Sequence, residues 1–91
     1  MIVRYYIDAE SGLPHIYKHD VGEQEVMEIL SRPGEDRRGR EGSRVAIGQT
    51  QTGRYLRVIY VVEQSSIFLV TAYELKGKPL LAYRRRRRRR D

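Results

Sequence analysis

Two histidines are the first residues of this chain whose spacing could support chemistry. His15 and His19 lie four positions apart, so a helix would place both rings on one face, and this spacing can bind zinc. The chain has no cysteine and no HExxH pattern to supply a third ligand, so we predict neither a metal nor a cofactor. His19 is the better candidate for a general acid or base, because Lys18 and Asp20 place a cation and a carboxylate beside it. A structural role for both histidines is the alternative.

A second group combines arginines with aromatic residues on three neighbouring β-rich segments. RNA cleavage without a metal needs a base for the 2′-hydroxyl, fixed cations for the charge growing on the phosphate, and an acid for the leaving oxygen. Arginine suits the phosphate because its charge is permanent and its planar fork binds two oxygens, and an aromatic ring can stack an unpaired base. We predict that Arg54 and Arg57 steady the phosphate, that Tyr73 or Tyr60 stacks a base, and that Arg44 contacts nucleic acid, with Glu74 nearby. The alternative is that these side chains are ordinary cross-strand pairs on an exposed sheet face.

Other chemistries find little support in the composition. Without cysteine there is no disulfide, zinc–thiolate or thiol nucleophile, and the sequence GQTQTG at 48–53 is too short and wrongly placed for a phosphate-binding P-loop. The apolar runs are far shorter than the roughly 20 residues that span a bilayer, and no basic-then-apolar signal pattern opens the chain. We therefore expect a cytoplasmic protein with no membrane partner.

The net charge of +6 comes entirely from the carboxyl-terminal arginines. The 91 residues include 18 Lys and Arg against 12 Asp and Glu, and seven of these cations with one acid belong to residues 84–91, which leaves 11 of each sign in residues 1–83. A run of this kind indicates an anionic partner, either RNA or an acidic protein surface. We predict one domain at 1–83 and a basic tail at 84–91. The tail residues that we expect to bind nucleic acid are Arg84, Arg85, Arg86, Arg87, Arg88, Arg89 and Arg90.

The first half of the chain predicts one strand and two helices. Residues 2–7 are β-branched and aromatic and end at a turn-forming DAESG segment. Leu13, Ile16 and Tyr17 then have the spacing of one apolar helix face. Asp20 and Glu23 have capping-box spacing, so a second helix should begin there, bury Val26, Ile29 and Leu30, and end at Pro33-Gly34.

The second half predicts an antiparallel sheet followed by a basic helix or tail. Residues 34–43 are charged and glycine-rich and should form a mobile loop. Three β-rich runs follow at 44–50, 54–64 and 66–75, joined by short polar segments, which is typical of an antiparallel meander. Pro79 favours the start of a helix, and Leu80, Leu81 and Tyr83 could pack its first turn against the domain. In the arginine run that follows, like charges at i+3 and i+4 should fray a helix until an anion neutralises them. We predict an α+β fold with both amino-terminal helices on one sheet face.

The order of these motifs resembles the BrnT-like toxins of bacterial type II toxin–antitoxin systems. The resemblance spans roughly residues 13–86. The chain is also similar to a related group of small bacterial proteins with an arginine-rich end. Its most specific parts are Lys18-His19, the G-x-T-x-x-G-R pattern from Gly48 to Arg54, and Thr71-Ala72-Tyr73-Glu74. Where BrnT-like proteins tend to have a serine-alanine-arginine step, this chain has Thr71-Ala72-Tyr73, so one expected cation is missing.

The resemblance implies a RelE-like fold and a toxin that stops translation by cleaving RNA. His19, Arg54 and Arg57 are the positions that match best. It also implies a cognate antitoxin encoded by an adjacent gene. A noncatalytic nucleic-acid-binding or protein-interaction module of the same fold is the alternative.

Overall fold

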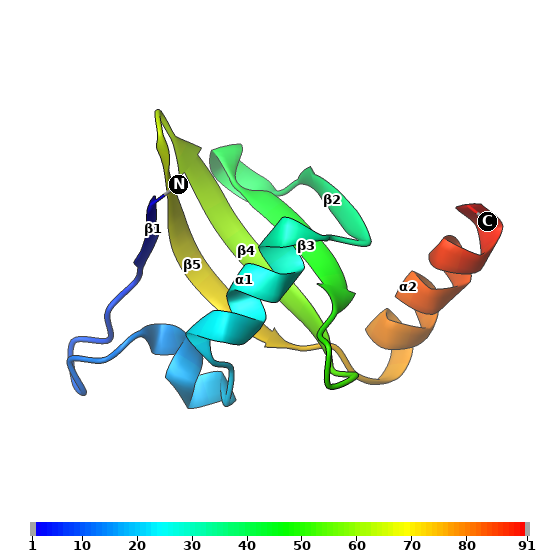
Figure 1. The fold of residues 1–91 in the computed structure, drawn as a ribbon, viewed down its shortest axis with the longest axis horizontal. Helices are drawn as coiled ribbons and strands as arrows, with labels where there is room; N and C mark the ends of the chain where they lie inside the picture. Colours follow the sequence, from blue (N-terminus) through cyan, green and yellow to red (C-terminus); the bar gives the residue numbers. More distant parts are fainter. Residues whose placement is uncertain (1, 91) are drawn as a thin grey trace.

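One mixed sheet of five strands organises the chain, in the spatial order β1-β5-β4-β3-β2 (Figure 1). The structure is a computed structural model and describes residues 2–90, the side chain of Arg90 excepted. The predicted α+β class is confirmed. The strands are β1 (Ile2–Tyr5), β2 (Glu35–Arg38), β3 (Arg44–Gln49), β4 (Tyr55–Glu63) and β5 (Ser66–Glu74); the helices are the 3₁₀ turns η1 (His15–His19) and η2 (Arg40–Gly42) and the α-helices α1 (Glu23–Ser31) and α2 (Gly77–Arg90).

The predicted meander is confirmed for β3, β4 and β5, but the sheet is not wholly antiparallel. β1 runs parallel to β5, with Ile2 opposite Ser66 and Tyr5 opposite Leu69. A parallel pair needs a crossover, which η1, α1 and the following strands provide. The predicted loop at 34–43 contains β2, which pairs with β3 from Glu35 opposite Ile47 to Arg38 opposite Arg44. An edge strand can be short and charged, so β2 lacks the apolar alternation that marks the other strands.

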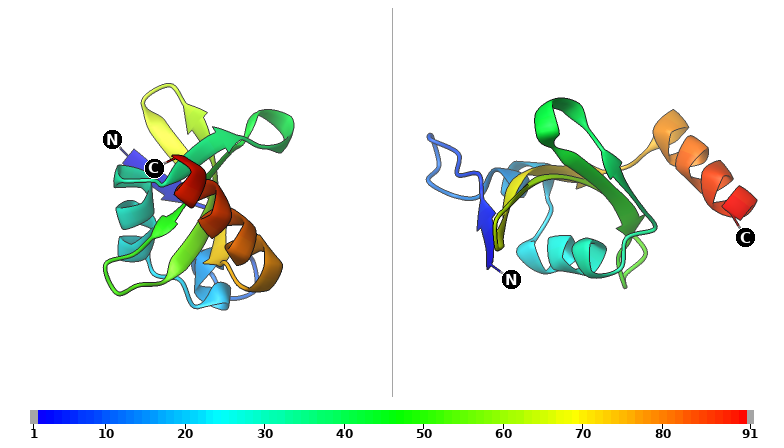
Figure 2. Two further views of the ribbon diagram at one scale, coloured as in Figure 1. Left: turned by 90° about the vertical axis from the view of Figure 1, so that its right-hand side faces the viewer. Right: turned by 90° about the horizontal axis from the view of Figure 1, so that it is seen from above.

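The main core lies between one face of the sheet and α1, which covers that face together with η1 (Figure 2). Leu56 and Val58 of β4 are fully buried there, and Val26 and Ile29 of α1 pack against them. Apolar residues alternate with more exposed ones along β4, which gives this face of the sheet its apolar character. Gly48 of β3 lies under α1, where an added Cβ would come within 3.3 Å of Ile29 Cδ1, so the glycine lets the helix approach closely.

The amino-terminal helices differ from the prediction. η1 is a single 3₁₀ turn in which Ile16 alone is buried, while Leu13 and Tyr17 remain largely exposed. Asp20 does not cap α1, because its backbone is left-handed at φ 57°. Instead α1 starts after Gly22, whose N–H donates to Glu25 Oε1 at 3.0 Å. Of the two helices predicted on one face, only α1 is an α-helix; η1 is a short 3₁₀ helix, and the second α-helix is α2.

The carboxyl-terminal helix begins near Pro79 as predicted and continues through the arginines. On the sheet face opposite α1, Val45, Ile47, Leu75 and Tyr83 form a second buried cluster, with Leu80 packed against it. Leu81 does not dock and is exposed. The boundary predicted between residues 83 and 84 thus falls inside α2, which projects past the β2–β3 side of the sheet (Figure 1). Among residues 2–90, no helix has the length and apolar character needed to cross a membrane.

Candidate nucleic-acid interface

Three of the four predicted catalytic residues lie next to one another at the edge of β5. β1 pairs with β5 only as far as Leu69, so the second half of this edge is left for η1. η1 brings the His19 ring to Tyr73, with ring centroids 6.0 Å apart at 63°. Tyr73 in turn lies directly across from Arg57 on β4, and neighbours in register share a sheet face. The structure therefore brings together His19, Tyr73 and Arg57.

Arg57 is the member of this group whose cation has no carboxylate partner among the described residues. Its side chain is half-buried on the sheet face opposite α1, and within residues 2–90 no carboxylate lies in ion-pair distance of it. Its Nε is buried and has no hydrogen-bond partner in the described part of the chain. Leaving a buried donor unpaired is unfavourable. Because this atom is out of contact with solvent, a phosphate oxygen would reach it only after neighbouring side chains move.

A second imidazole and a carboxylate extend the group. The His15 and His19 rings contact edge-on, with centroids 5.2 Å apart, and Tyr6 contacts His15 from the other side at 5.8 Å. Asp8 Oδ2 lies 2.6 Å from Lys18 Nζ and 3.8 Å from His15 Nδ1. The hydrogen bond from Lys18, assisted by the Glu10 N–H, lowers the pKa of Asp8. Asp8 therefore stays anionic beside His15.

Asp8 and Tyr6 are missed by the sequence-based prediction. The DAESG segment is typical of a turn and does form one. Its pattern does not indicate that Asp8 contacts Lys18 across the loop. In the described part of the chain, no three His, Asp or Glu side chains are arranged as metal ligands.

Arg54 has a structural position rather than the predicted place beside a phosphate. Its guanidinium donates to both carboxylate oxygens of Glu25, at 2.8 and 2.9 Å, and to Glu74 Oε1 at 3.3 Å. A further hydrogen bond of 2.9 Å reaches the carbonyl oxygen of Asp20. These bonds join the start of β4 to the start of α1 and the end of β5. Two carboxylates already neutralise the cation, so an RNA phosphate would have to displace them.

Tyr60 and Arg44 are also engaged with the protein itself. The Tyr60 ring is 6% exposed in the main core, so it offers no free face for a base. Its hydroxyl donates to Asp36 Oδ2, and Arg44 Nε donates to Asp36 Oδ1 at 3.0 Å. Burial, together with the bond to Asp36, raises the pKa of Tyr60. Burial thus leaves Tyr60 no free face for a base, whereas the contact of Arg44 with nucleic acid stays a prediction.

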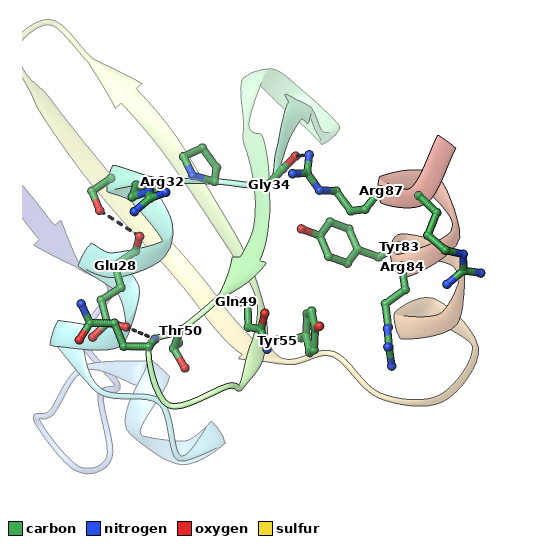
Figure 3. Close-up of a pocket in the computed structure, with 13 residues that line it drawn as sticks. Glu28, Arg32, Gly34, Gln49, Thr50, Tyr55, Tyr83, Arg84 and Arg87 are labelled. Atoms are coloured by element: carbon green, nitrogen blue, oxygen red, sulfur yellow. Dashed lines mark hydrogen bonds between the residues drawn. The ribbon is translucent and has the colours of Figure 1, made fainter. Parts of the chain in front are cut away.

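The arginines of α2 line a groove of about 780 Å³ between this helix and the end of α1 (Figure 3). Arg84, Arg87 and Arg88 face the groove, whereas Arg85 and Arg89 are exposed outside it. Arg86 instead binds Glu35 through two hydrogen bonds of 2.7 and 2.9 Å. The side chain of Arg90, also predicted to bind nucleic acid, lies outside the described residues.

The groove and the histidine group share no residue, although Tyr55 of the groove and Arg57 lie two positions apart on β4. The residues that line the groove come from α1 and the segment that follows it, the end of β3, the β3–β4 loop, Tyr55 and α2, and they include none of His19, Tyr73 and Arg57. Comparison with protein-family models, with curated protein sequences and with solved structures finds no match for this chain. The resemblance to BrnT-like toxins thus stays a prediction based on sequence motifs.

Proposed function

We propose that this chain is a metal-independent endoribonuclease whose reaction centre consists of His19, Tyr73 and Arg57. The observation that carries the proposal is the ring contact of His19 with Tyr73, directly across from an arginine with a buried, unpartnered Nε. Together with His15, these residues cover the three roles that the reaction needs: proton acceptor, fixed cation and proton donor.

In the proposed reaction the 2′-oxygen of one nucleotide attacks the adjacent phosphorus. His19 accepts the 2′-hydroxyl proton as the oxygen–phosphorus bond forms, and Arg57 binds the phosphate oxygens as their charge grows. The bond from phosphorus to the 5′-oxygen then breaks, and protonated His15, 5.2 Å from His19, donates the proton that this oxygen needs. The products are a 2′,3′-cyclic phosphate and a free 5′-hydroxyl, and the Tyr73 ring stacks the base beside the broken bond.

In the same proposal the fold is a variant of the RelE-like arrangement, in which η1 stands where the first amino-terminal helix is expected. The protein would act in the cytoplasm as a toxin, and an antitoxin encoded beside it would neutralise it. Residues 1–31 carry Arg4 and Lys18 against six acidic residues, a balance that suits a basic region of such a partner.

A noncatalytic single-stranded RNA-binding module is the second candidate. The groove beside α2 favours it, because its arginines need nothing from the histidine group to bind phosphates. The two candidates differ in what His19→Ala should do. In the ribonuclease this variant loses cleavage but still binds RNA, whereas in the noncatalytic module there is no cleavage to lose and binding is unchanged.

The test is cleavage of single-stranded RNA by the purified chain and by three variants. We expect His19→Ala to lower the cleavage rate by roughly 10²–10⁴-fold and Arg57→Ala to lower it comparably. Arg38→Ala is the matched control, because Arg38 is an exposed arginine on edge strand β2. Circular dichroism should show that all three variants fold. Full cleavage by both His19→Ala and Arg57→Ala would refute the reaction centre.

A further inference from the structure

We propose that the groove between α2 and the end of α1 is a preformed binding site for single-stranded RNA, separate from the reaction centre. The inference rests on the proposed function only in taking RNA as the ligand. It assigns different roles to the arginines of the run: Arg84, Arg87 and Arg88 bind the strand, while Arg85 and Arg89 do not. A disordered basic tail would use all of its arginines alike.

The groove has one basic wall and one polar wall, and the polar wall includes the carboxylate of Glu28, which accepts a hydrogen bond from the Gln51 N–H at 2.8 Å. α2 contributes Arg84, Arg87 and Arg88, and Arg32 adds a fourth guanidinium from the end of α1. Gln49, at the end of β3, lines the groove as well (Figure 3), and its amide donates to the Gly53 carbonyl oxygen at 3.3 Å. Gln51 of the β3–β4 loop is also among the lining residues. In residues 2–90 no acid forms an ion pair with Arg32, Arg84 or Arg88, so their charges can neutralise an anion.

Three kinds of contact hold α2 in place beside the sheet. Tyr83 is 4% exposed and packs its ring edge-on against Tyr55, with centroids 6.1 Å apart. Arg86 forms its paired hydrogen bonds with Glu35 on β2. Arg87 donates to the Gly34 carbonyl oxygen at 2.6 Å. Because the helix is already anchored, its arginines lose less freedom on binding a ligand than those of a flexible tail would.

The chemistry of the lining fits a nucleic-acid strand better than an acidic peptide. Arg84 and Arg88 lie one helical turn apart, about 6 Å along the axis, and guanidinium forks bind phosphate oxygens in pairs. The half-buried Tyr55 ring, with the Arg84 guanidinium 5.9 Å from its centroid, can stack a base, and glutamine amides can bind base edges. A docked peptide helix needs several apolar contacts, and Leu81, the most exposed apolar side chain of α2, does not line the groove.

Two double variants with the same loss of charge provide the test. Arg84→Ala/Arg88→Ala and Arg85→Ala/Arg89→Ala each remove two exposed arginines spaced four apart on α2, but only the first pair lines the groove. The probe is a fluorescent single-stranded RNA with 2′-O-methyl groups, which lacks the nucleophile for cleavage. Its dissociation constant is measured for the full chain over a range of NaCl concentrations.

We expect Arg84→Ala/Arg88→Ala to weaken binding at least about tenfold and to reduce the slope of log K against log salt by about 1.4, or 0.7 for each lost phosphate contact. Arg85→Ala/Arg89→Ala should change affinity by less than about threefold, with little change in slope. Equal losses of affinity in the two variants would overturn the assignment of the groove as the RNA-binding site. Tighter binding of polyglutamate than of the RNA probe at the same salt would identify an acidic protein as the ligand and would also overturn it.

Binding and cleavage are read separately in this design. Because the probe cannot be cleaved, a difference between the two double variants supports the groove even if the chain never cleaves unmodified RNA. Conversely, cleavage that depends on His19, combined with equal losses in the two variants, would support the proposed function and reject the groove.

Discussion

At the scale of single residues, the role of each arginine is decided by its partners. Arg54 and Arg57 lie three positions apart near the start of β4, and both suit a phosphate equally well by residue type. Arg54 meets Glu25 and Glu74, whereas Arg57 faces Tyr73 and keeps a buried, unpartnered Nε. We therefore assign the first to stability and the second to chemistry.

Replacement of Arg54 should affect stability more than cleavage. Arg54→Met leaves Glu25 and Glu74 without their cation, and losing one partner of a fully buried pair costs roughly 3–5 kcal/mol. The Arg54 side chain is 25% exposed, so solvent screening reduces the expected loss to about 1–3 kcal/mol. Urea unfolding measures this loss, and Arg57→Met is the control that should change stability far less. Lost cleavage with unchanged stability in Arg54→Met would contradict the assignment.

Asp8 should make the protein less stable in acid. Because Lys18 and the Glu10 N–H lower the pKa of Asp8 in the folded chain, the carboxylate stabilises the fold above its unfolded pKa, near 3.9, and this contribution is lost as pH falls through the folded value. Asp8→Asn should therefore be less stable than the wild type at pH 7, and the difference should shrink below about pH 4. Thermal unfolding at several pH values measures it. A difference that stays constant down to pH 2 would exclude this role for Asp8.

The sequence predicts the pairing of Arg57 with Tyr73 better than it predicts the partners of the other candidates. Alternation along β4 and β5 fixes which side chains share a face, and a meander places Arg57 beside Tyr73. The partners of Arg54 and Tyr60 come from segments 29 and 24 residues away. No local pattern records such pairs, because they depend on how α1 and β2 pack on the sheet.

At the scale of elements, long segments with a regular apolar pattern are predicted well from the sequence, whereas short polar elements are not. β4, β5 and α1 each bury a regular stripe, so their periodicity is visible in the sequence. β2 buries almost nothing, and its charged residues are typical of a loop. The predicted start of α1 rests on the capping-box spacing of Asp20 and Glu23, but the bond that forms is between Gly22 and Glu25.

Gly34 controls the docking of α2. A Cβ at this position would overlap the Tyr83 hydroxyl oxygen, so Gly34→Ala should displace the helix and cost about 1–3 kcal/mol. Tyr83→Phe removes that oxygen and should restore much of the stability in the double variant. Gly22→Ala is the matched control, because a Cβ there meets only Glu25 Oε1, at 3.9 Å. Urea unfolding and the proteolysis rate of α2 measure the effect; identical behaviour of Gly34→Ala and the wild type would contradict the docked helix.

At the scale of the whole molecule, charge and chemistry are separated. Residues 1–83 are formally neutral, and the net charge of +6 belongs to the carboxyl-terminal end of α2. The histidine group lies where η1 meets β5 and shares no residue with the groove. In this account α2 holds the RNA strand through electrostatic contacts, and the neutral body cleaves it.

The most direct measurement of the central claim is induced expression of the intact chain in a bacterial host, with growth and total-RNA integrity followed from induction. Wild type should arrest growth and degrade RNA, whereas His19→Ala and Arg57→Ala, expressed at equal levels, should do neither. Arg38→Ala should behave like the wild type. Normal growth and intact RNA with the wild-type chain, or unchanged RNA degradation by both His19→Ala and Arg57→Ala, would contradict the account.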